Sequence, residues 1–482
     1  RASDTVDDAL ATVPVDWPWW RRLAPLDAAL GPVVPTAAHP VSPAADPLAA
    51  LSVRIDHARA IGLPPAEVDA NPAHADFPGA VPAQAPRVSR ALTVHASYDG
   101  RDGRYVYSNA DAPVWRGTGL YAPAGEVVRV TVPAGAASAG LAARVGVHTD
   151  ALWDNDPWIR SPEITSRHPL TSPVTELASA FGGVIEIEVP AGAALGDIQV
   201  TVDGAVEMAR YVRGQTTPQQ WAAARLLDAP WAELEGARLV LNVPIATARA
   251  IADVEALVTF WDDVAAAEDE LAAIPAPPRS ERAVVDRQIS GGWMHSGYPF
   301  MANLQTAAEL TDLAGLTSAG SWGAFHELGH NHQLHDWILP GSTEASCNLW
   351  SVYVMEHLVG RPRALAHPDL APAARQARIS AYVQGGRSFA RDWSVWTSLE
   401  TYLQLQEAFG WGFYQALFAD YADDAASPST DQARIDLWVE RTSAEAGVDL
   451  GPFYQAWGFP ISPGTLATIS ALPPWTADPM NP

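Results

Sequence analysis

The chain has 482 residues, 48% of them hydrophobic and 18% charged, which is typical of a folded protein of two or three domains and excludes a disordered or fibrous chain. Its 30 basic and 55 acidic residues give a net charge of −25, which argues against nucleic acid as a partner. No run reaches the roughly 18 apolar residues of a membrane helix, so no integral membrane segment is predicted. The single cysteine, Cys347, excludes an intrachain disulfide.

Residues 1–90 are rich in Ala and Pro and are predicted to form an N-terminal extension with a short helical patch over residues 46–62. The chain begins at Arg1, with neither an initiating Met nor an apolar leader. From this we expect a secreted or cell-surface protein whose signal peptide has been removed. Six short alternating runs of β-branched residues between Leu92 and Gly204 predict a β-sandwich domain over residues 91–205.

After Val206 the apolar spacing becomes helical and predicts a mainly helical domain with a small sheet over residues 206–472. The fold class is therefore α+β with several domains. The expected helices cover residues 219–227, 248–273, 321–334 and 344–359, and the expected strands cover residues 237–245 and 283–289. The tail, residues 473–482, is expected to be loose.

The segment His326-Glu327-Leu328-Gly329-His330 contains the H-E-x-x-H arrangement. Residues four apart lie one turn above each other on a helix, so the two imidazoles can converge on one metal ion. Glu327 then lies beside them as a general base for an attacking water. Composition alone would give about 0.04 occurrences of this pattern, although His and Glu on one helix face can also be plain surface residues without a metal.

Glu344 is the candidate third ligand, because catalytic zinc sites use three protein ligands and leave a fourth position open. It lies fourteen residues after His330, beyond a Pro340-Gly341 turn, at the start of the next predicted helix. Two antiparallel helices would bring its carboxylate over the histidine pair. Asn348, one turn further on, is predicted to hold the free ring nitrogen of a ligating histidine. The sequence thus predicts one catalytic Zn²⁺ ion.

Three neighbouring side chains are interpreted as other than ligands. His332 points to a different helix face from His330, and His335 is five residues past it, so both are expected to surround the site or to be solvated. Cys347, three residues past Glu344, is expected to be a buried small apolar side chain.

These residues resemble the M60-like, enhancin-type zinc metallopeptidases, which are gluzincins with an H-E-x-G-H helix and a downstream T-E-x-x-x-N helix. The second motif matches Thr343 to Asn348. Further segments that resemble the family are WRGTGLYAPAGE at residues 115–126, FGGVI at 181–185, MHSGYP at 294–299, FGW at 409–411 and LGPFYQAWG at 450–458. The resemblance spans residues 92–462 and implies a thermolysin-like catalytic domain.

The resemblance also implies a substrate, because known family members cut host or mucin-type glycoproteins, several of them beside an O-glycosylated residue. Some of the 19 Trp residues could pack on sugar rings. Tyr298 and His295, in the MHSGYP segment, are candidate stabilisers of the oxyanion or contacts to substrate, although turn packing explains the tyrosine equally well. The strand expected over residues 282–290 could pair with an extended substrate.

The resulting prediction is a monomeric zinc endopeptidase that hydrolyses peptide bonds next to O-glycosylated Ser or Thr. Two alternatives stay open. One is a zinc protease that is indifferent to glycans. The other is a glycan-binding adhesive protein with an idle metal site, in which the β-domain would make the contacts.

Overall fold

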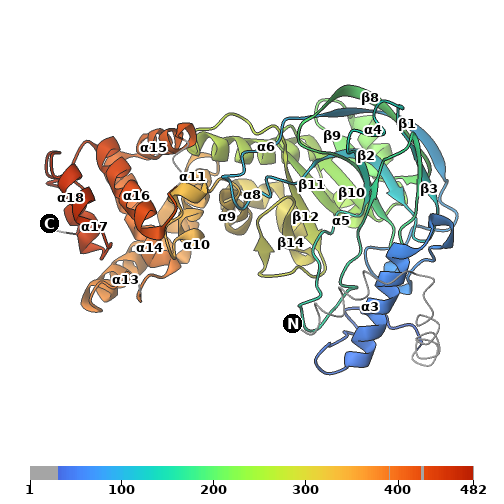
Figure 1. Cartoon of the computed structure of the whole chain (residues 1–482), viewed down its shortest axis with the longest axis horizontal. Helices are drawn as coiled ribbons and strands as arrows, with labels where there is room; N and C mark the ends of the chain where they lie inside the picture. Colours follow the sequence, from blue (N-terminus) through green and yellow to red (C-terminus); the bar gives the residue numbers. More distant parts are fainter. Residues whose placement is uncertain (1–30, 390, 425–427, 481–482) are drawn as a thin grey trace.

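The structure is a computed structural model that describes residues 31–389, 391–424 and 428–480. Figure 1 shows an elongated molecule with the strand-rich part at one end and a helical part at the other. The helices α9 (Trp322–His330) and α11 (Asn348–His357) lie between these two parts. The chain is therefore a mixed α and β protein; the first 30 residues of the predicted extension lie outside the described residues.

The first sheet has eight strands in the order β5-β4-β7-β2-β8-β3-β6, with β1 paired to β8. Its strands are β1 Val88–Tyr98, β2 Val114–Ala122, β3 Val128–Thr131, β4 Ala142–Val145, β5 Ser166–Pro169, β6 Val174–Leu177, β7 Gly183–Val189 and β8 Ala193–Glu207. Alternation along β8 buries Ile198, Val200 and Val202, as a strand with one face on the core requires. These side chains join an apolar core with residues of the other strands.

The second sheet has six strands in the order β13-β14-β12-β11-β10-β9. They are β9 Ala209–Val212, β10 Trp231–Glu235, β11 Leu239–Pro244, β12 Glu281–Asp286, β13 Met294–His295 and β14 Phe300–Asn303. The expected pairing of a substrate with the strand over residues 282–290 is wrong, because β12 already pairs on both sides, with β11 and with β14. The edge of the sheet is β13, which packs on α9.

Helices cover most of the second half of the chain. They are α3 Pro47–Gly62, α4 Pro218–Ala224, α5 Ile245–Ala250, α6 Val254–Leu271, α7 Ala307–Thr311, α8 Leu313–Ala319, α9, α10 Thr343–Ser346, α11, α12 Arg363–Ala366, α13 Pro372–Gln384, α14 Val395–Phe409, α15 Trp411–Asp423, α16 Asp431–Ala446, α17 Gly451–Ala456 and α18 Pro463–Ile469. The short 3-10 turns are η1 Pro65–Glu67, η2 Pro72–Ala75, η3 Leu304–Thr306, η4 His335–Trp337 and η5 Pro368–Leu370. Among the described residues no helix has both the length and the apolar character needed to cross a membrane.

The structure corrects two expectations, one about the helix over residues 248–273 and one about the tail. The segment 248–273 forms two helices, because Asp253 caps a new helix by accepting a hydrogen bond from the Ala256 backbone N–H. The tail is not loose as far as residue 480. Asp449 N donates to the Pro473 carbonyl, and the buried Met480 accepts a hydrogen bond from Gln404.

Candidate metal centre

The helix α9 carries the H-E-x-x-H segment and begins at a serine cap. Ser321 Oγ accepts a hydrogen bond from the Ala324 N–H, which satisfies a backbone donor that the first turn leaves unpaired. The two histidines follow one turn apart, and their Nε2 atoms lie 3.2 Å from each other. The helix ends at His330, four residues earlier than its apolar spacing predicts.

A glycine allows the next helical segment to approach α9 closely. A Cβ atom at Gly329 would lie 2.7 Å from the Cys347 carbonyl oxygen, which is too close, and 3.0 Å from Trp350 Cβ, which is tighter than usual. The expected helix over residues 344–359 is divided at Cys347 into α10 and α11. The Asn348 side chain donates to the Glu344 carbonyl, which a backbone N–H would otherwise use.

This close approach brings Glu344 to the histidine pair. Its Oε2 atom lies 3.1 Å from His326 Nε2 and 3.4 Å from His330 Nε2. A tetrahedral ion with bonds of about 2.0–2.2 Å holds its ligand atoms roughly 3.3 Å apart. The three atoms therefore form a triangle of the size that zinc requires.

Two amide side chains orient the imidazoles. Asn348 Nδ2 donates to the Glu344 carbonyl, so its Oδ1 faces His326 Nδ1 at 2.8 Å. Gln333 Nε2 donates to the Thr343 carbonyl and to Ser346 Oγ, so its Oε1 faces His330 Nδ1 at 2.7 Å. An amide oxygen only accepts, so each Nδ1 carries a proton, and each Nε2 faces Glu344, where it donates while it is protonated and can ligate a cation once it is not. Two such Nε2 atoms and a carboxylate can hold a cation between them.

The electrostatics of the site also favour a bound cation. Burial opposes protonation of His326, but the neighbouring Cys347 and Glu344 raise the pKa of its imidazole to about 11. Hydrogen bonds from both histidines hold the pKa of Glu344 far below its usual value. Both imidazoles therefore hold a proton that a divalent cation must displace when it binds.

Glu327 lies beside the three candidate ligands and is itself 8% exposed. Burial raises the pKa of its carboxyl above the ordinary value, against the lowering effect of the two histidines. Raising the pKa of a carboxylate toward neutrality improves it as a proton acceptor. Glu344, by contrast, is 58% exposed, so the triangle opens toward solvent on that side.

His295 lies on β13, within electrostatic reach of Glu327. Its Nε2 faces Asp150 Oδ2 at 2.8 Å, and its Nδ1 faces the Ser296 carbonyl at 3.0 Å. Both partners are acceptors, so both ring nitrogens carry protons and the ring is an imidazolium. Both N–H groups of His295 therefore already have acceptors in this structure.

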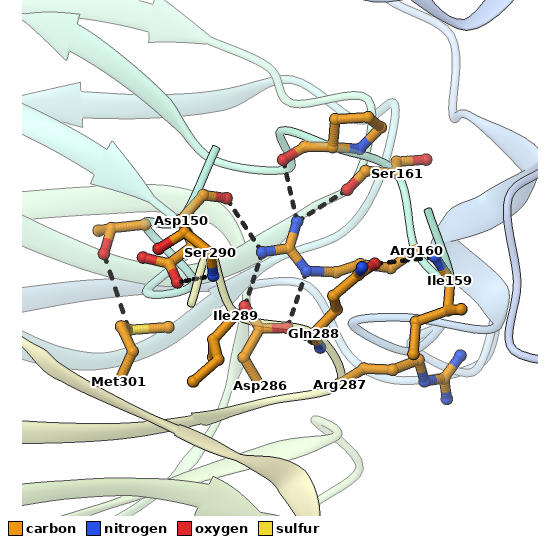
Figure 2. A network of polar contacts seen from close by, with 12 residues as sticks. Asp150, Ile159, Arg160, Ser161, Asp286, Arg287, Gln288, Ile289, Ser290 and Met301 are labelled. Carbon is orange, nitrogen blue, oxygen red and sulfur yellow. Dashed lines mark hydrogen bonds and ion pairs between the residues drawn. The ribbon is translucent and has the colours of Figure 1, made fainter. Parts of the chain in front are cut away.

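Asp150 is held in place by the polar network in Figure 2. Its carboxylate accepts a hydrogen bond from the Ser290 N–H at 2.6 Å, and its carbonyl accepts one from Arg160. The fully buried Arg160 also forms a two-pronged ion pair with Asp286, both contacts being 2.8 Å, at the end of β12. These contacts fix the loop that carries Asp150 to the second sheet, beside α9.

Tyr298 is buried away from these groups. Its hydroxyl accepts a hydrogen bond from the Trp115 N–H, and the Arg279 guanidinium lies 3.8 Å from the centre of its ring. These contacts join β2 to the segment after β13, so the structure gives Tyr298 a packing role. It is not brought together with the candidate ligands.

Two further side chains, Cys347 and Tyr107, lie beside the candidate ligands. Cys347 is fully buried, and its sulfur lies 3.4 Å and 3.7 Å from the two ring nitrogens of His326, so it is not aligned with the Nε2 lone pair. It nevertheless belongs to the one group in the described part of the chain that could hold a metal, together with His326, His330 and Glu344. Tyr107 also contacts His330, with 5.2 Å between the centres of their rings. It is far from the motif in the sequence, and no pattern there predicts this contact.

Taken together, the geometry gathers two histidines and one glutamate that could hold a metal ion, with a second, buried glutamate beside them. Comparison with known proteins agrees with a metal site of this kind. The family of peptidase M60, enhancin and enhancin-like proteins matches residues 204–458, and the N-terminal domain of M60-like peptidases matches residues 99–203. The chain belongs to the M60 peptidase family.

Three similar proteins illustrate the range of the family. TRPM8 channel-associated factor 2 from Bos taurus is 42% identical over 376 residues, covering 77% of this chain and 41% of the relative. The chain thus spans less than half the length of this relative. A functionally unknown conserved protein from Bacillus anthracis has a TM-score of 0.68 at 21% identity, covering 81% of this chain and 80% of the other. IMPa from Pseudomonas aeruginosa, solved in complex with an O-glycopeptide, has a TM-score of 0.58 at 16% identity, covering 90% of this chain and 57% of the other.

Proposed function

We propose that this protein is a zinc endopeptidase that hydrolyses peptide bonds in glycoproteins next to O-glycosylated Ser or Thr. The observation that carries the peptidase part is the triangle of His326 Nε2, His330 Nε2 and Glu344 Oε2 with the buried Glu327 beside it. The substrate part is supported by the structural likeness to a protein solved with an O-glycopeptide. A substrate of this kind favours a secreted or cell-surface protein, and we propose that it acts as a monomer.

In the proposed layout, residues 91–205 form a β-sandwich and residues 206–472 a thermolysin-like gluzincin domain. The matched family regions, residues 99–203 and 204–458, support this division. The segment before residue 91 would be an extension, of which α3 packs beside the first domain, where Val41 pairs with Trp158.

The proposed mechanism assigns each side chain one task. His326, His330 and Glu344 would hold the ion, and Asn348 and Gln333 would keep both imidazoles in the ligating tautomer. Zinc bound there would supply a Lewis acid that lowers the pKa of water to about 7. Glu327 would accept the proton of the attacking water and pass it to the leaving amine.

The proposal is tested with a glycopeptide that carries one O-linked sugar and with the same peptide after removal of the sugar. Zinc-loaded protein is expected to cut the glycopeptide beside the modified residue, as mapped by mass. Glu327→Gln is expected to lower kcat by about 10²–10⁴ with unchanged zinc content. Equal cleavage of both peptides would instead favour a glycan-independent protease, and full activity of Glu327→Gln would refute the mechanism.

A second candidate function is favoured by the identity to a channel-associated factor. In that case the chain would act by binding another protein or a glycan, and the metal site would be idle. Retention of all three candidate ligands and of Glu327 supports the enzyme instead. Glycan or protein binding by zinc-loaded protein that cuts no peptide would favour the binding function.

A further inference from the structure

Three aromatic rings from three parts of the chain pack together in a buried box. Phe77 comes from the segment of residues 72–79, His148 from the loop after β4, and Trp231 from the start of β10. The ring of His148 lies 4.8 Å from that of Phe77 and 4.4 Å from that of Trp231, and all three side chains are buried. Residues 72–79 lie before both matched family regions, so the box ties the extension to the two sheets.

The segment that carries Phe77 is held on the second sheet from two sides. On the inner side Trp231 Nε1 donates to the Pro78 carbonyl at 2.8 Å. On the outer side Arg287 pairs with the Asp76 carboxylate and donates to the Asp76 carbonyl at 3.1 Å, and its guanidinium lies 5.2 Å from the centre of the Phe77 ring. The histidine closes the box from the side of the first sheet, so docking of the segment depends on the state of its ring.

The surroundings of this histidine disfavour a charge. His148 is 2% exposed, a backbone hydrogen bond to Val285 supports its ring, and its Nε2 has no hydrogen-bond partner among the described residues. A neutral ring can leave an unprotonated nitrogen in apolar surroundings, whereas an imidazolium would bury an N–H without an acceptor. Burial and the nearby Arg160 hold the pKa of His148 well below its usual value, against the opposite effects of the Val285 bond and of Asp150.

The charged groups around the box do not supply the missing acceptor. Three carboxylates lie on the elements that pack around it, and each is already paired: Asp150 with His295, Asp286 with Arg160, and Asp76 with Arg287. Figure 2 shows the Arg160 guanidinium between Asp150 and Asp286. A proton on His148 would therefore meet a buried positive charge and no free acceptor.

We propose that His148 makes the docking of residues 72–79 sensitive to acid. The segment stays docked while the ring is neutral, and it opens when the ring takes up a proton from solvent, because water then supplies the acceptor that the closed box lacks. Opening also removes one support of the loop that carries Asp150, the partner of His295. The inference goes beyond the proposed peptidase function and does not depend on it.

The direction and the size of the effect follow from the two states of the ring. In the open segment the exposed imidazole ionises near its ordinary pKa of about 6.5, whereas in the closed box it stays neutral. Docking is therefore fully favoured above about pH 6.5 and is weakened as the pH falls below that value. Between pH 7.5 and pH 5 the population of the open segment is expected to rise about 30-fold.

Hydrogen exchange of the full chain, measured by mass spectrometry and corrected for the intrinsic exchange rate, tests this opening. The Phe77 and Gly79 amides are the reporters, because both donate to backbone carbonyls within the docked segment. Their protection is expected to fall about 30-fold between pH 7.5 and pH 5 in the wild type, and to change little in His148→Gln, whose side chain cannot ionise. The matched control is His95→Gln, which removes an exposed histidine on β1 and should show the wild-type fall.

The buried strand β7 serves as the internal reference for unfolding of the whole chain. A fall that is limited to residues 72–79 and absent from His148→Gln would support the proposal. No fall in the wild type, an equal fall in the variant, or an equal fall in β7 would overturn it. If His148→Gln does not fold, His148→Leu takes its place. If neither variant folds, the wild-type profile decides, because the fall must begin near pH 6.5 and approach about tenfold per pH unit below it.

Discussion

Two histidines at the C-terminal end of α9, His330 in its last turn and His332 just beyond it, have partners on different sides of the helix. His330, on the side of the metal centre, donates one N–H to the neutral amide of Gln333 and directs its other nitrogen toward His326 and Glu344. His332, on the other side, donates one N–H to the Leu328 carbonyl at 2.9 Å and the other to Asp269 at 3.0 Å. The second nitrogen of His330 faces the other candidate ligands and can bind a metal once it loses its proton, whereas the second nitrogen of His332 is held by Asp269.

The partner of the second nitrogen therefore decides what a histidine can do. An amide oxygen holds the proton on Nδ1, which leaves Nε2 as the atom that can ligate a metal. At His332 the second nitrogen donates to Asp269 and keeps its proton. Although burial opposes the charge on His332, hydrogen bonds to Asp269 and Glu268 raise the pKa of its imidazole to about 10. Although they are only two positions apart in sequence, His330 is placed to bind a metal and His332 to stabilise the fold.

The largest expected effect comes from breaking the metal side. His330→Gln removes one of three ligands, so we expect zinc content after dialysis to fall from one ion per chain to none and peptidase activity to be lost. Excess zinc stabilises the wild type by about 2.7 kcal/mol at 100 times Kd, and this gain should vanish in the variant. His332→Gln is the matched control and should still bind one zinc. Zinc retention by His330→Gln would contradict the assignment.

The next effect is on stability and comes from the other side of α9. His332→Gln leaves the buried Glu268 without its cationic partner and leaves Asp269 with Arg238 alone. Breaking a buried ion pair costs about 3–5 kcal/mol, so urea unfolding at pH 6 should show a loss of this order. If the variant were as stable as the wild type, His332 would not have the stabilising role assigned to it.

The pH dependence of stability sharpens the same comparison. The pKa of His332 is raised when folded, so its contribution is fully present below about 6.5 and is lost as the pH rises through about 10. Burial raises the pKa of Glu268 to about 7, so ionisation of this group also reduces stability as the pH rises above its ordinary range. The free energy of unfolding of metal-free protein should therefore decline from pH 6.5 to 10. The decline should be shallower in His332→Gln by the contribution of one imidazole, because His326 and His330 still titrate in metal-free protein, and an equal slope would contradict the assignment.

How far the sequence could predict this site depends on how local each contact is. His326, His330 and Glu344 come together within nineteen residues, so helical spacing and one short turn were enough to predict that they would meet. Gln333, three residues past His330, has the spacing of a side-chain partner, but the end of α9 at His330 could not be foreseen from apolar periodicity.

Other contributions come from distant segments that carry no local signal. Asp150 meets His295 across 145 residues, and Tyr107 reaches His330 from a loop between β1 and β2. The division of the predicted helix at Cys347 depends on a side-chain hydrogen bond of Asn348, which competes with the backbone in a way that residue spacing does not reveal. Tertiary contacts of this kind complete a site whose local pattern the sequence already shows.

The smallest effect we predict separates the two orienting amides from the ligands themselves. Asn348→Ala and Gln333→Ala should each lower zinc affinity about 10–100-fold, because the ring they hold can then rotate or change tautomer. Asn348→Asp keeps an acceptor for His326 and should lose less than Asn348→Ala. Gln199→Ala, an exposed amide on β8, is the control and should bind zinc as the wild type does. Competition with a chromophoric chelator measures all four affinities. If both alanine variants kept wild-type affinity, the partner of the second nitrogen would not govern ligation, and Glu344 would have to orient the rings alone.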